Sequence, residues 1–207
     1  QAGDTVVVGA KKYILKGANL ISNPGFESGF TGWTDATSSA ATLTSANFRI
    51  ETSGGVDNSK YLVGTKNESA SSAGSIGTGW KIESGKTYLF SYNVKYTSST
   101  AAAASEEYLK ISLTNTKTAS AEPKVLIAAT QVNGGGQWTF NSVVFTNSDP
   151  AYSYVVARFR WLGGRLGFDG FSLNEAYEMP DIAGLRGIIT QAQAAYSASG
   201  KSEAKRS

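Results

Sequence analysis

The feature that most constrains the fold is a series of short segments in which apolar and polar residues alternate. The clearest is Thr87–Tyr96, where every second residue is aromatic or aliphatic: Tyr88, Phe90, Tyr92 and Val94. A repeat of two residues is that of a β-strand with one buried face. The segment therefore predicts a strand with one face packed on a core.

Other segments rich in β-forming residues follow along the chain, separated by Gly, Asn, Ser and Pro. They are Thr5–Val8, Lys12–Lys16, Ala41–Thr44, Phe48–Thr52, Tyr61–Gly64, Tyr108–Thr114, Val125–Ala129, Trp138–Thr146, Ser153–Leu162 and Arg165–Leu173. We expect Ser75–Ile82 and Thr87–Tyr96 to be two strands joined by a tight turn at Gly85. Strands at this spacing predict an all-β sandwich or barrel, and a double-sheet jelly roll accommodates them.

After Glu178 the pattern changes to that of an amphipathic helix. Its apolar residues are three and four positions apart: Leu185, Ile188, Ile189, Ala192 and Ala195. Pro180 and Asp181 are typical of a helix start, and Gly200 of a helix end. The fold prediction is therefore a β-sandwich with a short C-terminal helix.

The composition excludes several kinds of site. The 207 residues contain no Cys and no His, so disulfides, thiolate metal sites, Ser-His-Asp triads and the usual zinc sites are absent. A glycosidase that uses two carboxylates remains open. Its candidates Glu51, Glu106 and Glu107 have no site-like surroundings, and we interpret them as solvated charges. The chain is predicted not to be an enzyme.

Charge and hydropathy further limit the classes of binding partner. Nineteen Lys and Arg against 16 Asp and Glu give a net charge of +3 without a basic stripe, which disfavours nucleic-acid binding. No apolar run is long enough to insert into a membrane. Few charges and many aromatic residues are typical of an extracellular β protein, so we expect a secreted or cell-surface protein, extracellular or periplasmic in a bacterium.

Four segments carry a resemblance to a known group of proteins. Asn19–Glu27, read NLISNPGFE and followed by Gly32-Trp33, resembles the opening of carbohydrate-binding modules of families 4, 9 and 22. GKTYLFS at 85–91, GQW at 136–138 and GFDGFSL at 167–173 resemble later parts of these modules, in the same order. The resemblance implies a galactose-binding-like jelly roll.

The resemblance also implies a function and an organisation. The module would span residues 19–178, preceded by a strand extension over 1–18 and followed over 179–207 by a helix and tail leading to a further domain. We expect a non-catalytic module that binds a polysaccharide or oligosaccharide, joined to a catalytic domain in a longer glycan-degrading protein. The alternative is a structural, spacer or adhesion β-sandwich without a sugar site, since one scaffold serves several roles.

Glu27 and Asp169 are the candidate metal ligands. The resemblance implies a structural Ca²⁺ held by these two positions, between the first loop and the last strand. Carboxylates and backbone carbonyls are the oxygen ligands that Ca²⁺ takes. In the alternative, Glu27 caps N–H groups of a loop and Asp169 makes a hydrogen bond within a turn.

Sugar recognition needs an exposed aromatic ring and polar groups beside it. Alternation along the predicted strands puts one tyrosine and several polar or cationic residues on outward faces. Trp161 lies at the end of its strand, beside Gly163 and Gly164. The predicted carbohydrate-binding residues are Asn93, Tyr108, Lys110, Arg158, Arg160 and Trp161. We expect the strand residues to line one concave sheet face with Tyr108 as the platform, the alternative being an ordinary solvated face. Trp33, Trp80 and Trp138 are expected in the core.

Overall fold

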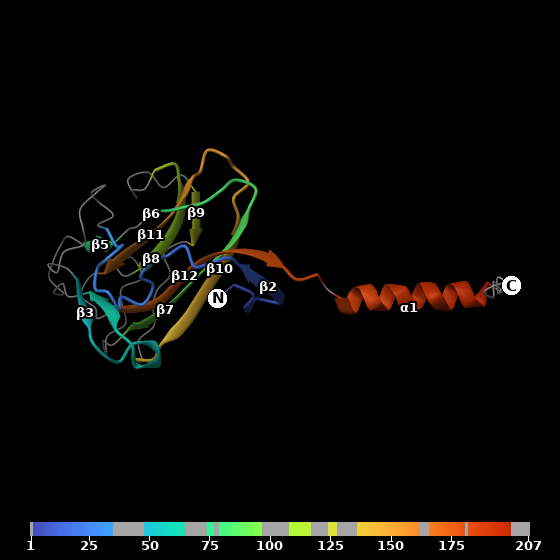
Figure 1. Cartoon of the computed structure of the whole chain (residues 1–207), viewed down its shortest axis with the longest axis horizontal. Coiled ribbons are helices and arrows are strands. Elements are labelled where there is room, and N and C mark those ends of the chain that lie inside the picture. Colours follow the sequence, from blue (N-terminus) through green and yellow to red (C-terminus); the bar gives the residue numbers. More distant parts are fainter. Residues whose placement is uncertain are drawn as a thin grey trace. The chain divides into compact units, whose positions relative to one another are not determined.

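A computed structural model of the chain consists mainly of two antiparallel β-sheets (Figure 1). The residues that it describes are 2–34, 48–64, 74–76, 79–96, 108–116, 124–127, 136–161, 166–180 and 182–199. The predicted all-β sandwich with a C-terminal helix is confirmed. The predicted strand Ala41–Thr44 lies outside the described residues.

The larger sheet has seven strands and includes both the first and the last strand of the chain. Its members are β1 (Thr5–Val8), β2 (Lys11–Lys16), β3 (Phe48–Glu51), β4 (Tyr61–Gly64), β7 (Thr87–Tyr96), β10 (Thr139–Thr146) and β12 (Leu166–Glu178). The long strand β12 connects them, since β2, β4 and β7 all pair with it, and β10 pairs with β7. A short 3₁₀ helix, η1 (Val56–Asn58), lies in the loop between β3 and β4.

The smaller sheet has five strands arranged around β11. Its members are β5 (Gly74–Ile76), β6 (Gly79–Lys81), β8 (Tyr108–Thr114), β9 (Lys124–Ile127) and β11 (Tyr154–Trp161). Strand β11 pairs with β5, β6 and β8, and β9 extends the sheet beyond β8.

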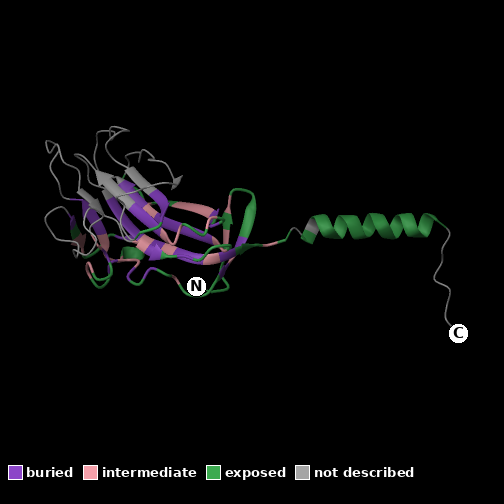
Figure 2. Cartoon of the chain, turned by 90° about the horizontal axis from the view of Figure 1, so that it is seen from above, coloured by how far each residue is buried: buried purple, intermediate pink, exposed green. Residues whose placement is uncertain are grey.

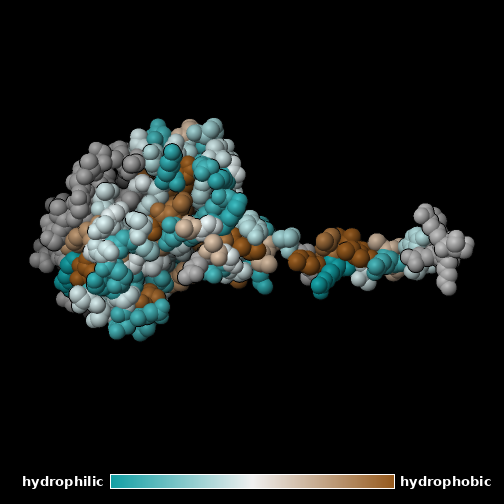
Figure 3. Space-filling view, viewed as in Figure 1, coloured by the Kyte–Doolittle hydropathy of each residue, from teal (hydrophilic) through white to brown (hydrophobic). Residues whose placement is uncertain are grey.

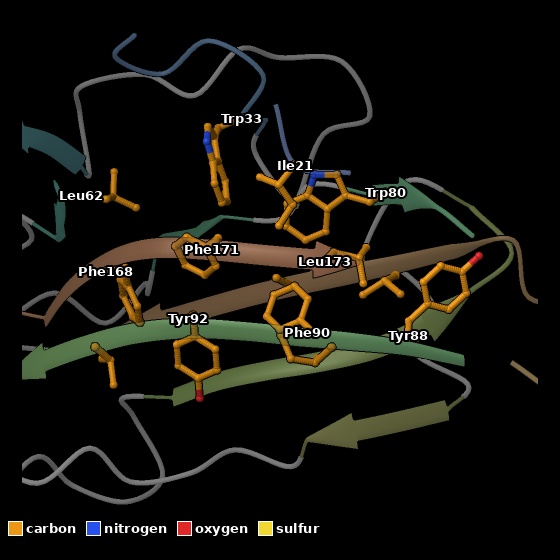
Figure 4. Packing of buried hydrophobic residues seen from close by; sticks show 14 of the residues in the cluster. Ile21, Trp33, Leu62, Trp80, Tyr88, Phe90, Tyr92, Phe168, Phe171 and Leu173 are labelled. Carbon is orange, nitrogen blue, oxygen red and sulfur yellow. The ribbon is translucent and has the colours of Figure 1, made fainter. Parts of the chain in front are cut away.

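The main core lies between the two sheets. The predicted inner face of β7 is buried, because Tyr88, Phe90, Tyr92 and Val94 are each 3% exposed or less. Figure 4 shows Phe171 of β12 between Trp33 and Tyr92, and the ring centroids are 5.0 Å and 6.0 Å from it. Ile111 and Leu113 of β8 and Val155 and Ala157 of β11 close the core from the five-stranded sheet.

The predicted tight turn at Gly85 joins β6 to β7, but the two strands do not pair with each other as a hairpin would. Strand β6 pairs with β11, whereas β7 pairs with β10 and β12, so the turn carries the chain from one sheet to the other. Before the turn, the N–H of Ile82 donates to the carbonyl of Ser153 at 2.9 Å. Within it, the N–H of Gly85 donates to the carbonyl of Asn147 at 2.7 Å. The two halves of the turn therefore bond to different neighbours.

A second, smaller core lies on the outer face of the seven-stranded sheet. The hairpin of β1 and β2 brings Tyr13 and Leu15 onto Leu89 of β7 and Ala176 of β12, and all four side chains are buried. Figure 2 shows the buried residues running along the strands in purple. The N-terminal strands therefore cover part of a face that would otherwise be open to water.

The C-terminal segment forms a unit of its own. The chain divides into two compact units, Gln1–Tyr177 and Glu178–Ser207, and the second contains helix α1 (Ile182–Ala198). The apolar side chains of α1 that the structure describes are exposed, which Figure 2 shows in green and Figure 3 in brown. No helix in the described part of the chain is long and apolar enough to cross a membrane.

Candidate ion site and carbohydrate-binding faces

The loop from Asn19 to Trp33 is fixed to strand β12 by hydrogen bonds. The side chain of Asn19 accepts from the N–H of Leu173 at 2.9 Å and donates to the carbonyl of Phe171 at 2.9 Å. The N–H of Phe171 in turn donates to the carbonyl of Pro24 at 3.0 Å. An asparagine side chain thus supplies the pairing that a neighbouring strand would supply.

Asn23 and the aromatic residues of the same loop organise its interior. The buried Asn23 amide donates to the carbonyls of Gly29 and Thr31 at 2.9 and 3.0 Å. The indole N–H of Trp33 donates to the carbonyl of Asn23 at 2.9 Å, and Phe26 stacks on Trp33 with centroids 4.6 Å apart. This part of the motif therefore builds the fold.

Glu27 and Asp169 line an open hollow of about 490 Å³ between this loop, η1 and β12. A Cβ atom placed on Gly25 would lie 3.3 Å from Oδ1 of Asp169 and 4.0 Å from Oε1 of Glu27, so both carboxylates converge on this glycine. Glu27 accepts the N–H of Lys60 at 2.9 Å. The two candidate metal ligands are thus close together, as the prediction requires.

Asp169 is buried, and its carboxylate accepts hydrogen bonds from three donors. Its Oδ2 accepts from the N–H of Val56 at 2.8 Å and the hydroxyl of Ser59 at 2.9 Å, and its Oδ1 from the N–H of Gly170 at 2.6 Å. Burial raises the pKa of Asp169 above its ordinary value, and the negative charge of Glu27 adds to the effect, although the three hydrogen bonds oppose it.

The oxygen atoms that Glu27 and Asp169 offer can be compared with the ligands that a cation requires. Oxygen atoms from two carboxylates suit Ca²⁺, which takes six to eight oxygen ligands. Among the described residues no three Asp, Glu, His or Cys side chains gather, so backbone carbonyls and water would supply the rest. The hydrogen bonds from Lys60 and Val56 also match the alternative prediction, in which Glu27 and Asp169 only bind loop N–H groups. The residues fit an ion, and its presence stays a prediction.

Four of the predicted sugar-binding residues face one another across two neighbouring strands. In the backbone register of β8 and β11, Tyr108 lies opposite Arg160 and Lys110 lies opposite Arg158. Residues opposite each other in a sheet share a face. Trp161 ends β11 in the same sheet. The structure describes the backbone of these five residues and not their side chains.

Asn93 does not belong to that group. It lies on β7 in the seven-stranded sheet, opposite Phe140 of β10 and Asp169 of β12. The expectation that all the predicted strand residues line one sheet face is therefore wrong for Asn93. Alternation along a strand identifies a face but not the sheet to which the strand belongs.

Trp138 also departs from its prediction. Trp33 and Trp80 are buried, as expected, whereas Trp138 is half-buried and lies outside the core. The ammonium of Lys95 lies 4.5 Å from the Trp138 ring and 3.8 Å from the ring of Tyr61. Lys95 and the indole N–H of Trp138 both donate to the carbonyl of Gly54, at 2.7 and 3.1 Å.

Comparison with known families agrees with this architecture. The model of a carbohydrate binding domain family, of the type of carbohydrate-binding modules 4 and 9, matches residues 18–159. The chain belongs to this family. The match begins at the loop fixed by Asn19 and runs into β11, so it covers the ion-site loop and four of the six predicted sugar-binding residues up to Arg158. No curated protein matches this carbohydrate-binding domain at a significant level.

Solved structures share the fold of this carbohydrate-binding domain. A xylan-binding domain of family 22 from Paenibacillus barcinonensis has a TM-score of 0.53 at 17% identity, with 77% of this chain and 95% of that chain covered. A family 61 module in complex with β-1,4-galactotriose has a TM-score of 0.52 at 15% identity, covering 77% and 99%. The tailspike protein 4 enzymatically active domain of bacteriophage CBA120 has a TM-score of 0.51 at 13% identity, covering 76% and 21%.

The domain offers little support for a two-carboxylate glycosidase. Glu51 lies on β3 and binds the guanidinium of Arg49 through Nε at 2.6 Å, in an exposed position. A surface ion pair of this kind is typical of a solvated sheet edge. Glu106 and Glu107 lie outside the described residues.

Proposed function

We propose that this chain binds a polysaccharide without cleaving it, through the outer face of its five-stranded sheet. The observation that carries the proposal is the family match over residues 18–159. The register of β8 and β11 supports the choice of face, because it pairs Tyr108 with Arg160 and Lys110 with Arg158. Tyr can stack on the apolar face of a sugar, and Arg and Lys can hydrogen-bond its hydroxyl groups, so these residue types at neighbouring register positions suit the proposal.

The proposal extends to the setting of the domain. As a binding module it would hold a catalytic domain of the same longer protein close to an insoluble or branched substrate. Tethering of this kind raises the effective concentration of one site near another. Such a protein would work outside the cell or on its surface, where polysaccharide is found.

Affinity electrophoresis of the chain through gels that contain xylan, glucan, mannan or pectin tests this function. We expect retardation by at least one glycan, and weaker retardation of the double variant Arg158→Ala/Arg160→Ala. A matched control is Arg49→Ala, which removes an exposed guanidinium from the other sheet. Migration of the unmodified chain unchanged in every gel would rule the function out and favour a spacer.

We also propose that Glu27 and Asp169 hold a structural Ca²⁺. The convergence of both carboxylates on Gly25 supports it, because two carboxylates at one point offer a cation oxygen ligands of opposite charge. A ligand that binds only the folded state raises its stability, by about 2.7 kcal/mol at a hundredfold excess over the dissociation constant. EDTA should therefore lower the melting temperature, and CaCl₂ should restore it.

The variant Glu27→Gln should lose the response to Ca²⁺, while Glu51→Gln, which neutralises an exposed carboxylate elsewhere, should keep it. Equal melting temperatures of the unmodified chain in EDTA and in CaCl₂ would contradict the calcium proposal. The hydrogen bonds of Glu27 and Asp169 would then be their whole role.

A further inference from the structure

The outer face of the seven-stranded sheet carries an exposed aromatic ring that the proposed function does not use. Phe140 of β10 is 54% exposed. Val143 and Phe145, further along the strand, pack on the main core, and Val144 packs on the second core outside the sheet. Phe140 and Val144 are four residues apart on one strand, so their side chains lie on the same face of the sheet. The side chain of Phe140 therefore projects from the outer face.

The residues beside Phe140 on this face are polar. Asn93 of β7 lies directly opposite it, and two residues further along the strands Ser142 lies opposite Ser91. Among the described residues the amide of Asn93 has no hydrogen-bond partner, and its Nδ2 would lie 2.8 Å from a Cβ atom on Gly170. Asn93 is half-buried, so part of its side chain is open to solvent.

Two packed clusters border the outer strip, which we define as Phe140, Asn93, Ser91 and Ser142. On one side is the Lys95 cluster, in which the ammonium contacts the rings of Tyr61 and Trp138 and donates to Gly54. On the other side is the second core, where the β1–β2 hairpin packs on Leu89. Ser91 is only 5% exposed, so contacts with a ligand on the outer strip would come mainly from Phe140 and Asn93.

The chemistry of the outer strip suits a neutral sugar. Trp138 lies directly before β10, two residues or about 7 Å from Phe140 along the chain. At this spacing the two aromatic side chains lie on the same face. The amide and the hydroxyl groups of the strip are uncharged donors and acceptors. The neighbouring cation, Lys95, is held by a carbonyl and two rings, so it offers little to an acidic ligand.

We propose that the outer strip is a second carbohydrate-contact surface, in which Phe140 stacks on the apolar face of a neutral sugar and Asn93 hydrogen-bonds its hydroxyl groups. The inference rests on the proposed function, since it assumes a domain that binds polysaccharide. It adds a surface on the opposite sheet from the face of Tyr108 and Arg160. One chain could then bind two segments of the same glycan.

Phe140→Ala tests the second surface, with Val7→Ala as the matched control. Both side chains are exposed to a similar degree, 54% and 58%, so neither change should alter the melting temperature. In gels that retard the unmodified chain, we expect Phe140→Ala to raise the dissociation constant roughly 3- to 10-fold, the range of one aromatic contact. Val7→Ala should not change it, and Phe140→Tyr, which keeps the ring, should retain most of the binding.

The outcomes separate this inference from the proposed function. If the unmodified chain is retarded and Phe140→Ala is retarded equally, the second surface is overturned and the proposed function stands. If Arg158→Ala/Arg160→Ala binds as the unmodified chain does and Phe140→Ala does not, the second surface is supported and the five-stranded face is wrong. If no glycan retards the unmodified chain, the proposed function itself fails, and the second surface with it.

Discussion

At the scale of single residues, asparagine side chains hold the first loop in the place of regular sheet pairing. Asn19 bonds to both the N–H of Leu173 and the carbonyl of Phe171, and Asn23 spans the loop from Ser28 to Thr31. An amide can donate and accept at once, which makes it suited to pair with backbone groups that have no strand beside them. This explains why the segment reads as a loop in the sequence and yet is densely hydrogen-bonded.

Replacing Asn23 should therefore destabilise the fold. Asn23→Ala would leave the carbonyls of Gly29 and Thr31 and the N–H of Ser28 without their partner. A hydrogen bond contributes about 0.5–1.5 kcal/mol to the free energy of unfolding, so the loss of three bonds from a buried side chain should cost roughly 2–4 kcal/mol in urea denaturation. Asn141→Ala removes one exposed hydrogen bond and should lose less than about 1 kcal/mol. Equal losses would contradict this role of Asn23.

At the scale of elements, the turn through Gly85 joins the two sheets and is fixed by a buried phenol. The N–H of Glu83 donates to the hydroxyl oxygen of Tyr88 at 2.9 Å. Burial raises the pKa of Tyr88 above its ordinary value of 10.0. The folded chain therefore keeps this proton more firmly than the unfolded chain does.

This shift predicts a pH dependence of stability. Because the folded pKa is raised, the contribution of Tyr88 is fully present below pH 10.0 and is lost as the pH rises through the folded pKa. Urea denaturation from about pH 8 upward should show the unmodified chain losing stability above pH 10 faster than Tyr88→Phe, which has no phenol proton. Tyr177→Phe, an exposed site, should follow the unmodified chain. Parallel curves for all three would refute the assignment.

The same element shows what the sequence can and cannot predict. The inner face of β7 follows from alternation, since a period of two residues distinguishes the two faces of a strand. The pairing of β6 with β11, and not with β7, does not follow, because a short turn is compatible with a hairpin and with a crossing between sheets. Only hydrogen bonds to Ser153 and Asn147, distant in sequence, decide between them.

At the scale of the whole molecule, the candidate binding residues divide between two sheets. Alternation places Tyr108 and Arg160 on one face, and they lie opposite each other in the structure, whereas Asn93 lies in the other sheet. The sequence alone does not predict on which face of the sheet Trp138 and Phe140 lie, because large apolar residues of β10 occur on both faces of the strand. The pairing of β10 with β7 resolves this and brings the two residues beside Lys95 and Asn93.

The measurement that most directly tests non-catalytic polysaccharide binding combines retention and product analysis. The unmodified chain is incubated with each glycan that retards it, and new reducing ends are counted against a heat-inactivated sample. We predict retention with no new reducing ends, because the two carboxylates that lie together are already hydrogen-bonded: Asp169 accepts three hydrogen bonds, and Glu27 accepts the N–H of Lys60. New reducing ends above the control, or the absence of retention by every glycan, would contradict the account.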